Sequence, residues 1–103
     1  MQTSEVIVLG GGVIGCAVAY ELACRGARVQ VIDRREVGLG ATQAAAGVLA
    51  PYLESHQGSP LVELGARSLA LYDEFVARVV EDSGSAVQYT RSGTLEVAMD
   101  DAS

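Results

Sequence analysis

The residues whose types and spacing suggest chemistry lie near the amino terminus. Gly10, Gly12 and Gly15 have the spacing G-x-G-x-x-G, and Asp33 follows Gly15 by 18 residues. In such a motif the first glycine permits a tight turn, the second lets a pyrophosphate approach the backbone, and the third allows close packing of helix and strand. A carboxylate at this distance accepts hydrogen bonds from ribose hydroxyls. The pattern therefore predicts a binding site for a dinucleotide.

The surrounding sequence predicts the elements that must position these residues. Residues 4–10 form a short β-branched run, typical of a strand buried on both faces of a parallel sheet. Residues 16–26 have the pattern of a helix that ends at a C′ glycine, and residues 27–33 alternate as a second strand. A glycine-rich turn that only reverses the chain is the alternative, but the complete βαβ unit favours a dinucleotide site.

The acid at the end of the second strand bears on the choice of dinucleotide. The carboxylate of Asp33 would repel the 2′-phosphate of NADP, although Arg34 and Arg35 directly after it weaken that exclusion. NAD enzymes and flavoproteins share this βαβ unit, so it does not separate the two classes.

The composition excludes several classes of protein. The 103 residues are enough for one small domain or for part of a larger protein, and half of them are hydrophobic. Thirteen acidic and seven basic side chains give a formal net charge of −6, without a basic cluster for nucleic acid. The apolar run 6–20 follows Glu5 and is interrupted by glycines, which argues against an export signal or a membrane span. We therefore expect a cytoplasmic protein without nucleic-acid or membrane partners.

A second unusual stretch follows the predicted second strand. Residues 41–51, ATQAAAGVLAP, contain five alanines and one glycine, and their only polar side chains are Thr42 and Gln43. One interpretation is a short alanine-rich helix packed on the sheet, because alanine is the best helix former. The other is that small residues leave room for a cofactor beside the backbone.

The second interpretation is favoured by a family resemblance. The stretch RREVGLGATQAAAGVLAP resembles the second flavin-contacting segment of the D-amino-acid oxidase-like FAD-dependent oxidoreductases, whose pattern is small-Thr-x-x-Ala-Ala-Gly. The form AAAG followed by an apolar residue, leucine and a small residue looks most like the glycine oxidases of thiamine biosynthesis. The resemblance covers nearly all of the chain, but only the amino-terminal part of the family's fold.

The resemblance implies FAD as the cofactor and places residues around it. It implies that the Thr42 hydroxyl bonds a phosphate oxygen and that Ala46, Gly47 and Val48 lie near the flavin ring, where glycine oxidases often carry methionine in place of Val48. With the glycine motif, the expected cofactor-binding residues are Gly10, Gly12, Val13, Ile14, Gly15, Asp33, Arg34, Ala41, Thr42, Ala45, Ala46, Gly47 and Val48.

The rest of the chain predicts supporting structure. Ser59 and Pro60 begin a helix over residues 61–81 as N-cap and first helical residue. Residues 86–100 suggest two short strands, and the single histidine, His56, suggests a solvated loop. We expect an α/β fold: a Rossmann-like FAD-binding βαβ unit, a helix and the first hairpin of a second sheet, in a fragment of a two-domain flavoenzyme. Residues 1–86 would belong to the FAD-binding part and residues 87–103 to the start of the substrate domain.

By resemblance, the function is oxidation of glycine or another small amine or amino acid to an imine. The family's chemistry implies hydride transfer to flavin N5 and reoxidation by oxygen with release of hydrogen peroxide. No catalytic residue is assigned, because the family's carboxylate-binding arginine comes later in the chain, and no metal site is predicted. The alternatives are an NAD-dependent dehydrogenase domain and a truncated chain without stable cofactor binding. The substrate, the choice between oxidase and dehydrogenase, and the homo-oligomeric state of a full-length enzyme stay open.

Overall fold

The computed structural model describes residues 3–54, 58–97 and 99, and it divides the chain into two compact units. The first unit is Met1–Val48 and the second is Leu49–Ser103. The boundary expected after residue 86 concerns the cofactor and substrate parts of a larger enzyme, and it stays a prediction. Among the described residues, no helix is both long and apolar enough to cross a membrane.

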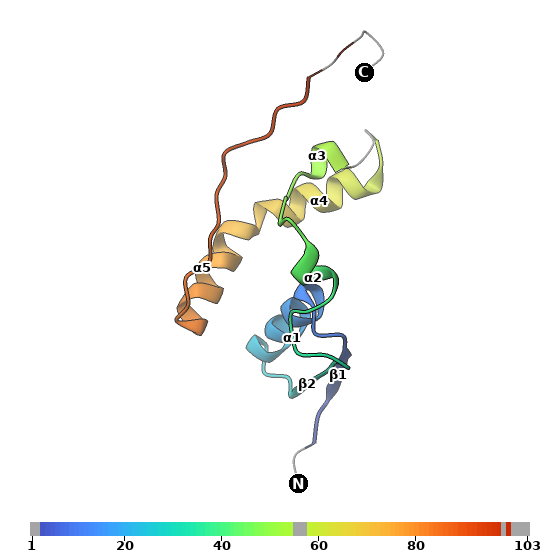
Figure 1. Ribbon diagram of the computed structural model, residues 1–103. Coiled ribbons are helices and arrows are strands. Elements are labelled where there is room, and N and C mark those ends of the chain that lie inside the picture. The colour runs from blue at the N-terminus through green and yellow to red at the C-terminus, as the bar shows by residue number, and fades with distance from the viewer. Residues whose placement is uncertain (1–2, 55–57, 98, 100–103) are drawn as a thin grey trace. The chain divides into compact units, whose positions relative to one another are not determined.

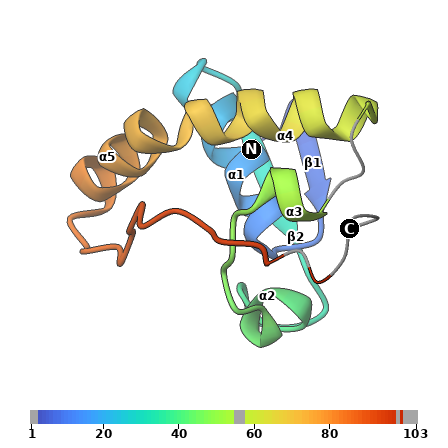
Figure 2. The same cartoon turned by 90° about the horizontal axis from the view of Figure 1, so that it is seen from above.

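The first unit contains the predicted βαβ arrangement. Strand β1 (Val6–Leu9) leads to helix α1 (Val13–Cys24), and strand β2 (Val29–Ile32) follows (Figure 1). The strands are parallel, with Val6 opposite Val29 in the register. Helix α1 contacts both strands, as Figure 2 shows from above. The α/β fold class expected from the sequence is therefore confirmed.

The strands are covered on one face rather than on two. Val8 lies on the covered face, because its Cγ1 would be 3.3 Å from a Cβ built on Gly15 of α1. The alternate positions Ile7 and Leu9 are 56% and 81% exposed. The expectation that the strand within residues 4–10 is buried on both faces is wrong for the described residues, because one crossover helix covers only one face of a two-stranded sheet.

Gly26 ends helix α1 as predicted. Its φ is +90°, in the left-handed region that glycine adopts at low cost. The Gly26 N–H donates to the Ala23 carbonyl at 3.0 Å, and the Ala27 N–H donates to the Leu22 carbonyl at 3.0 Å. This pair of bonds is the Schellman motif, which redirects the chain into β2.

The second unit is helical. It contains α3 (Pro51–Glu54), α4 (Pro60–Ala70) and α5 (Tyr72–Ser83). The Ser59 hydroxyl accepts a hydrogen bond from the Leu61 N–H at 3.2 Å, which confirms the predicted cap at the start of α4. Helices α3 and α4 lie side by side in Figure 2 and contact each other.

The predicted helix over residues 61–81 is divided in two. Leu71, with φ −87° and ψ −10°, is the last cap of α4 and the first cap of α5. Its N–H bonds the Ser68 carbonyl at 3.0 Å, an i to i−3 contact that tightens the final turn of α4. Asp73 and Glu74 occupy the first turn of α5, where negative charge favours a new helix start. The expectation of one continuous helix was therefore wrong.

The hairpin expected over residues 86–100 is not formed within the described residues. Gly84, with φ +69°, ends α5, and residues 84–97 contain neither helix nor strand. An isolated two-stranded hairpin is only marginally stable, so a strand pattern needs a larger sheet to pair with. His56 lies outside the described residues.

Candidate functional site

The glycine turn connects β1 to α1 through close backbone contacts. The Gly10 N–H donates to the Ile32 carbonyl at 2.8 Å, and the φ of Gly10 is +107°. A Cβ on Gly15 would collide with the Gly10 carbonyl oxygen. These contacts fit the two roles predicted for the first and third motif glycines, a tight turn and close packing of the helix.

The start of α1 leaves backbone donors free. Gly12 is the N-cap residue, and it provides no side-chain cap. The first turn contains no acidic residue. Within the described residues, the Ile14 and Gly15 amides have no hydrogen-bond acceptor. Together with the helix dipole, these donors give the turn a positive potential suited to an anion.

Thr42 brings the alanine segment to the same helix end. Its hydroxyl oxygen accepts a hydrogen bond from the Val13 N–H at 2.8 Å, across 29 positions of sequence. A Cβ on Gly12 would lie 2.9 Å from this oxygen. The two segments that the sequence singled out separately, the glycine motif and the alanine run, therefore meet at the first turn of α1.

Asp33 is held by backbone groups directly after β2. One carboxylate oxygen accepts from the Gly11 N–H at 2.7 Å, and the other accepts from the Arg35 N–H at 2.9 Å. The Gly11 bond and then the Arg35 bond lower the pKa of Asp33, with a smaller contribution from the positive charges of Arg35 and Arg34. The carboxylate is therefore an ionised acceptor, and each oxygen keeps a further lone pair for a ligand hydroxyl.

Gly11 is a site residue that the sequence analysis did not single out. It is buried, and its carbonyl accepts from the Gly38 N–H at 2.8 Å while its amide is bonded to Asp33. A Cβ on Gly11 would lie 3.2 Å from Val37 Cγ2. The run of three consecutive glycines was the available signal, because the middle one falls on a free position of the motif.

The alanine run forms only one helical turn. Helix α2 spans Ala41–Ala44, and Ala45 leaves it with φ −75° and ψ 144°. The alternative interpretation, an alanine-rich helix packed on the sheet, is therefore realised as no more than a single helical turn. Residues 45–48 are exposed, and the space at Gly47 is open, since a Cβ there would have no heavy atom within 4 Å.

The predicted residues fall into two groups in the structure. The motif glycines, Val13, Ile14, Asp33 and Thr42 lie at or contact the glycine turn. Arg34, Ala41 and residues 45–48 are exposed, and within the described part of the chain residues 45–48 make no hydrogen bond to this turn. A shallow apolar depression of the second unit, beside Pro51 and Gly65, contains none of the predicted residues. The described residues contain no cluster of three or more His, Cys, Asp or Glu side chains that could hold a metal ion.

Comparison with known proteins relates this chain to FAD-dependent oxidoreductases. The sequence model of a family described as "FAD dependent oxidoreductase" (DAO) matches residues 5–103. Glycine oxidase from Geobacillus kaustophilus (strain HTA426) is 37% identical over 94 residues, which are 91% of this chain and 25% of that protein. The bifunctional protein ThiO/ThiG from Nostoc sp. (strain PCC 7120 / SAG 25.82 / UTEX 2576) is 40% identical over 94 residues, or 91% of this chain and 14% of that protein.

The solved structures agree with the sequence relatives. The crystal structure of glycine oxidase from Geobacillus kaustophilus matches with a TM-score of 0.75 and 41% identity, over 79% of this chain and 22% of that chain. The chain therefore spans about a quarter of the length of the glycine oxidases that it matches. Because the family match covers almost all of the sequence, this chain belongs to the DAO family of FAD-dependent oxidoreductases.

Proposed function

We propose that this chain binds FAD through its first unit and forms the amino-terminal part of an amine or amino-acid oxidoreductase. The overall reaction would convert glycine or another small amine to an imine, with oxygen reduced to hydrogen peroxide. Family membership supports an FAD-dependent oxidoreductase, and the relatives named glycine oxidase support the substrate class. When bound, FAD would supply the redox chemistry, and the protein would supply orientation and electrostatics.

One observation carries the assignment of the site. The hydrogen bond from the Val13 N–H to the Thr42 hydroxyl joins the glycine motif to the alanine segment. Either segment alone has an ordinary structural explanation, a chain reversal or a turn of alanine-rich helix. Their meeting at a helix end with unpaired N–H groups supports a site for the two phosphates of a dinucleotide.

The residues of the first unit match the chemical parts of FAD. The Ile14 and Gly15 amides at the start of α1 would bind the pyrophosphate, since both lack an acceptor among the described residues. The ionised Asp33 would accept hydrogen bonds from the ribose hydroxyls of the adenosine half, with Arg34 beside it. Thr42, on the turn that begins with Ala41, would reach the phosphates from the other segment.

The backbone after α2 is suited to the flavin end of the cofactor. Ala45, Ala46, Gly47 and Val48 leave the peptide groups accessible, because three of the four carry little or no side chain. Gly47 has φ +79° and open space around it. These residues would contact the flavin through backbone groups, and none of them can transfer a proton. The chain's proposed contribution is therefore binding and orientation rather than acid–base catalysis.

Two alternatives to FAD binding are supported by different observations. An NAD-dependent dehydrogenase domain would share the glycine turn and Asp33, but the family match extends through the alanine segment and favours a flavin. A chain without stable cofactor binding is supported by exposed apolar side chains, such as Leu9 at 81% and Ile14 at 78%. The cytoplasmic location stays a prediction, as does homo-oligomerisation.

The binding proposal is tested with the purified chain. After incubation with FAD and gel filtration, we expect the absorption bands of oxidised flavin to elute with the protein, and NAD in a parallel dialysis not to be retained. Retention of NAD without flavin would support the dehydrogenase alternative. Retention of neither nucleotide would support the alternative without stable cofactor binding.

The substrate proposal needs the rest of an enzyme. Residues 1–103 can replace the matching amino-terminal region of the Geobacillus kaustophilus glycine oxidase, where the two proteins are 37% identical. We expect the chimera to release hydrogen peroxide when glycine is added, and the same chimera with Gly12→Val to be inactive. A folded, FAD-loaded chimera that oxidises no small amine would contradict the proposed reaction.

A further inference from the structure

We propose that Thr42 is a positioning residue that assembles the cofactor site before the cofactor arrives. Its hydroxyl fixes the alanine segment to the first turn of α1 and keeps its own proton for a phosphate oxygen. This inference rests on the proposed function for its second half only. The attachment itself is a property of the protein alone.

The hydrogen-bonding capacity of the hydroxyl supports both roles. A threonine hydroxyl has one donor and two acceptor lone pairs. The Val13 N–H, at 2.8 Å, occupies one lone pair of Thr42. Within the described residues the hydroxyl proton has no acceptor, so it is available to an incoming anion. The same helix end contributes the unpaired Ile14 and Gly15 amides.

The alanine segment needs this attachment because its own structure is weak. Helix α2 is a single turn, closed by the Ala44 N–H to the Gly40 carbonyl at 3.3 Å and the Ala45 N–H to the Thr42 carbonyl at 3.3 Å. One turn of helix is not stable by itself, because nucleation is costly. The bond between Thr42 and the Val13 N–H therefore joins the helical turn itself to α1, whereas the Gly38 N–H to Gly11 carbonyl bond holds only the loop before it.

The contact with Thr42 gives a second reason, besides the approach of a pyrophosphate, why residue 12 is glycine. Its φ of −77° and ψ of −174° are open to any residue, so its backbone conformation does not require glycine. Among the described residues, and apart from its neighbours in sequence, a Cβ on Gly12 would have only Thr42 atoms within 4 Å, with Oγ1 at 2.9 Å and Cβ at 3.9 Å. A side chain at Gly12 would therefore push Thr42 from the Val13 amide even when no cofactor is bound.

The first test measures the attachment without cofactor. Thr42→Val keeps the shape of the side chain but removes the hydroxyl, Thr42→Ser keeps the hydroxyl, and Gln43→Ala is a control on the same turn. We expect faster amide hydrogen exchange at Val13 in Thr42→Val, by about tenfold for the loss of one hydrogen bond, and wild-type exchange in Thr42→Ser and Gln43→Ala. Unchanged exchange at Val13 in Thr42→Val would overturn the inference.

A double-mutant cycle tests the link to Gly12. Gly12→Ala should speed exchange at Val13 in the wild-type background. In the Thr42→Ala background the same change should have almost no further effect, because the atom that it would displace is gone. Equal effects in both backgrounds would show that Gly12 acts independently of Thr42, against the inference.

The second test separates phosphate binding from general stability. Binding of ADP, which carries a diphosphate, is compared with binding of adenosine, which carries none, for the wild type, Thr42→Ser and Thr42→Val. We expect Thr42→Val to weaken ADP binding by about tenfold and to leave adenosine binding unchanged, with Thr42→Ser close to wild type. Equal loss for both ligands, or tighter ADP binding by Thr42→Val, would overturn the donor role. Wild-type protein that binds neither FAD nor ADP would instead overturn the proposed function.

Discussion

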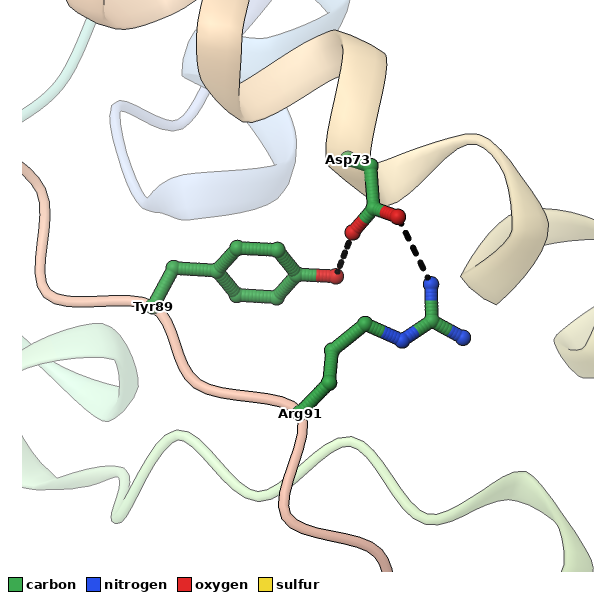
Figure 3. A network of polar contacts seen from close by, with 3 residues as sticks. All are labelled: Asp73, Tyr89 and Arg91. Atoms are coloured by element: carbon green, nitrogen blue, oxygen red, sulfur yellow. Dashed lines mark hydrogen bonds and ion pairs between the residues drawn. The ribbon is translucent and has the colours of Figure 1, made fainter.

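The two compact units hold their polar side chains in different ways. In the first unit, Asp33 and Thr42 accept hydrogen bonds from backbone N–H groups of the glycine turn and α1. In the second unit, Asp73 accepts from two other side chains, the Tyr89 hydroxyl at 2.8 Å and the Arg91 guanidinium at 3.2 Å (Figure 3). Backbone-held groups keep their place as long as the fold persists, whereas side-chain partners rotate independently.

The side-chain network of the second unit attaches the segment after α5 to that helix. The Tyr89 bond and then the Arg91 bond lower the pKa of Asp73. Desolvation and then the bond to Asp73 raise the pKa of Tyr89, whose ring lies 6.1 Å from the ring of Tyr72. All three polar groups are on exposed or half-exposed residues, so the network orders a surface segment.

This difference in how the polar groups are held indicates which of the two units is suited to bind a ligand. A binding site needs groups held in fixed geometry by the elements around them. The glycine turn with Asp33 and Thr42 meets that requirement. The Asp73 network instead attaches the segment after α5 to that helix.

Gly15→Val should unfold or strongly destabilise the first unit. The added side chain would collide with the Gly10 carbonyl oxygen and approach Val8, and a backbone collision cannot be relieved by a rotamer change. We expect a loss of about 3 kcal/mol of unfolding free energy, the upper part of the range for overpacking. Urea denaturation measures it, with Ala23→Val on an exposed position of α1 as the control. Similar stabilities of the two variants would mean that the turn tolerates displacement.

Gly12→Val should remove FAD binding while leaving the second unit intact. The side chain would occupy the space beside the Thr42 hydroxyl, which is the point where the two segments meet. We expect about a 100-fold loss of FAD affinity, which corresponds to roughly 3 kcal/mol, measured by flavin fluorescence titration. Retained affinity in a folded variant would contradict the assignment of the dinucleotide site to this turn.

Asp33→Asn should reduce the acid sensitivity of the protein. The folded structure lowers the pKa of Asp33 below its usual 3.8, so the stabilisation is complete above that value and is lost as the pH falls through the lowered pKa. Wild-type unfolding free energy should therefore decrease below about pH 4 more steeply than that of Asp33→Asn. Denaturation curves at several pH values measure the slopes, and parallel slopes would mean that the backbone bonds to Asp33 do not favour its charged form.

Asp73→Asn should have the smallest effect on function. It removes the charge that pairs with Arg91 and weakens the bond to Tyr89, so the segment over residues 85–97 should exchange amide hydrogens faster. FAD affinity should change by less than about twofold, since none of the three residues of the network is among those proposed to bind FAD. A tenfold change in FAD affinity would show that the second unit contributes to the cofactor site.

Local features of the fold could be predicted from the sequence. The βαβ unit follows from β-branched runs, glycine spacing and the C′ glycine at Gly26, all of which act within a few residues. The Ser59 cap of α4 is equally local. The acidic pair Asp73 and Glu74 was an available signal for the division of the helix at Leu71, whereas the apolar pattern runs on through this point.

The contacts that join distant residues could not be predicted. The bond between Val13 and Thr42 depends on how the loop after β2 folds back, and the Asp73 network depends on the path of a segment without regular structure. Strand formation over residues 86–100 also depends on pairing partners, which no local pattern supplies. The family resemblance placed Thr42 near phosphates, but the structure was needed to find its bond to α1.

The assignment of FAD binding to the first unit and not to the second is tested most directly by hydrogen–deuterium exchange of the whole chain with and without saturating FAD. We expect FAD to slow exchange at residues 10–15, 33–35 and 41–48 and to leave α4 and α5 unchanged. Protection confined to the helices of the second unit, or no protection anywhere, would contradict a cofactor site built by the glycine turn and the alanine segment.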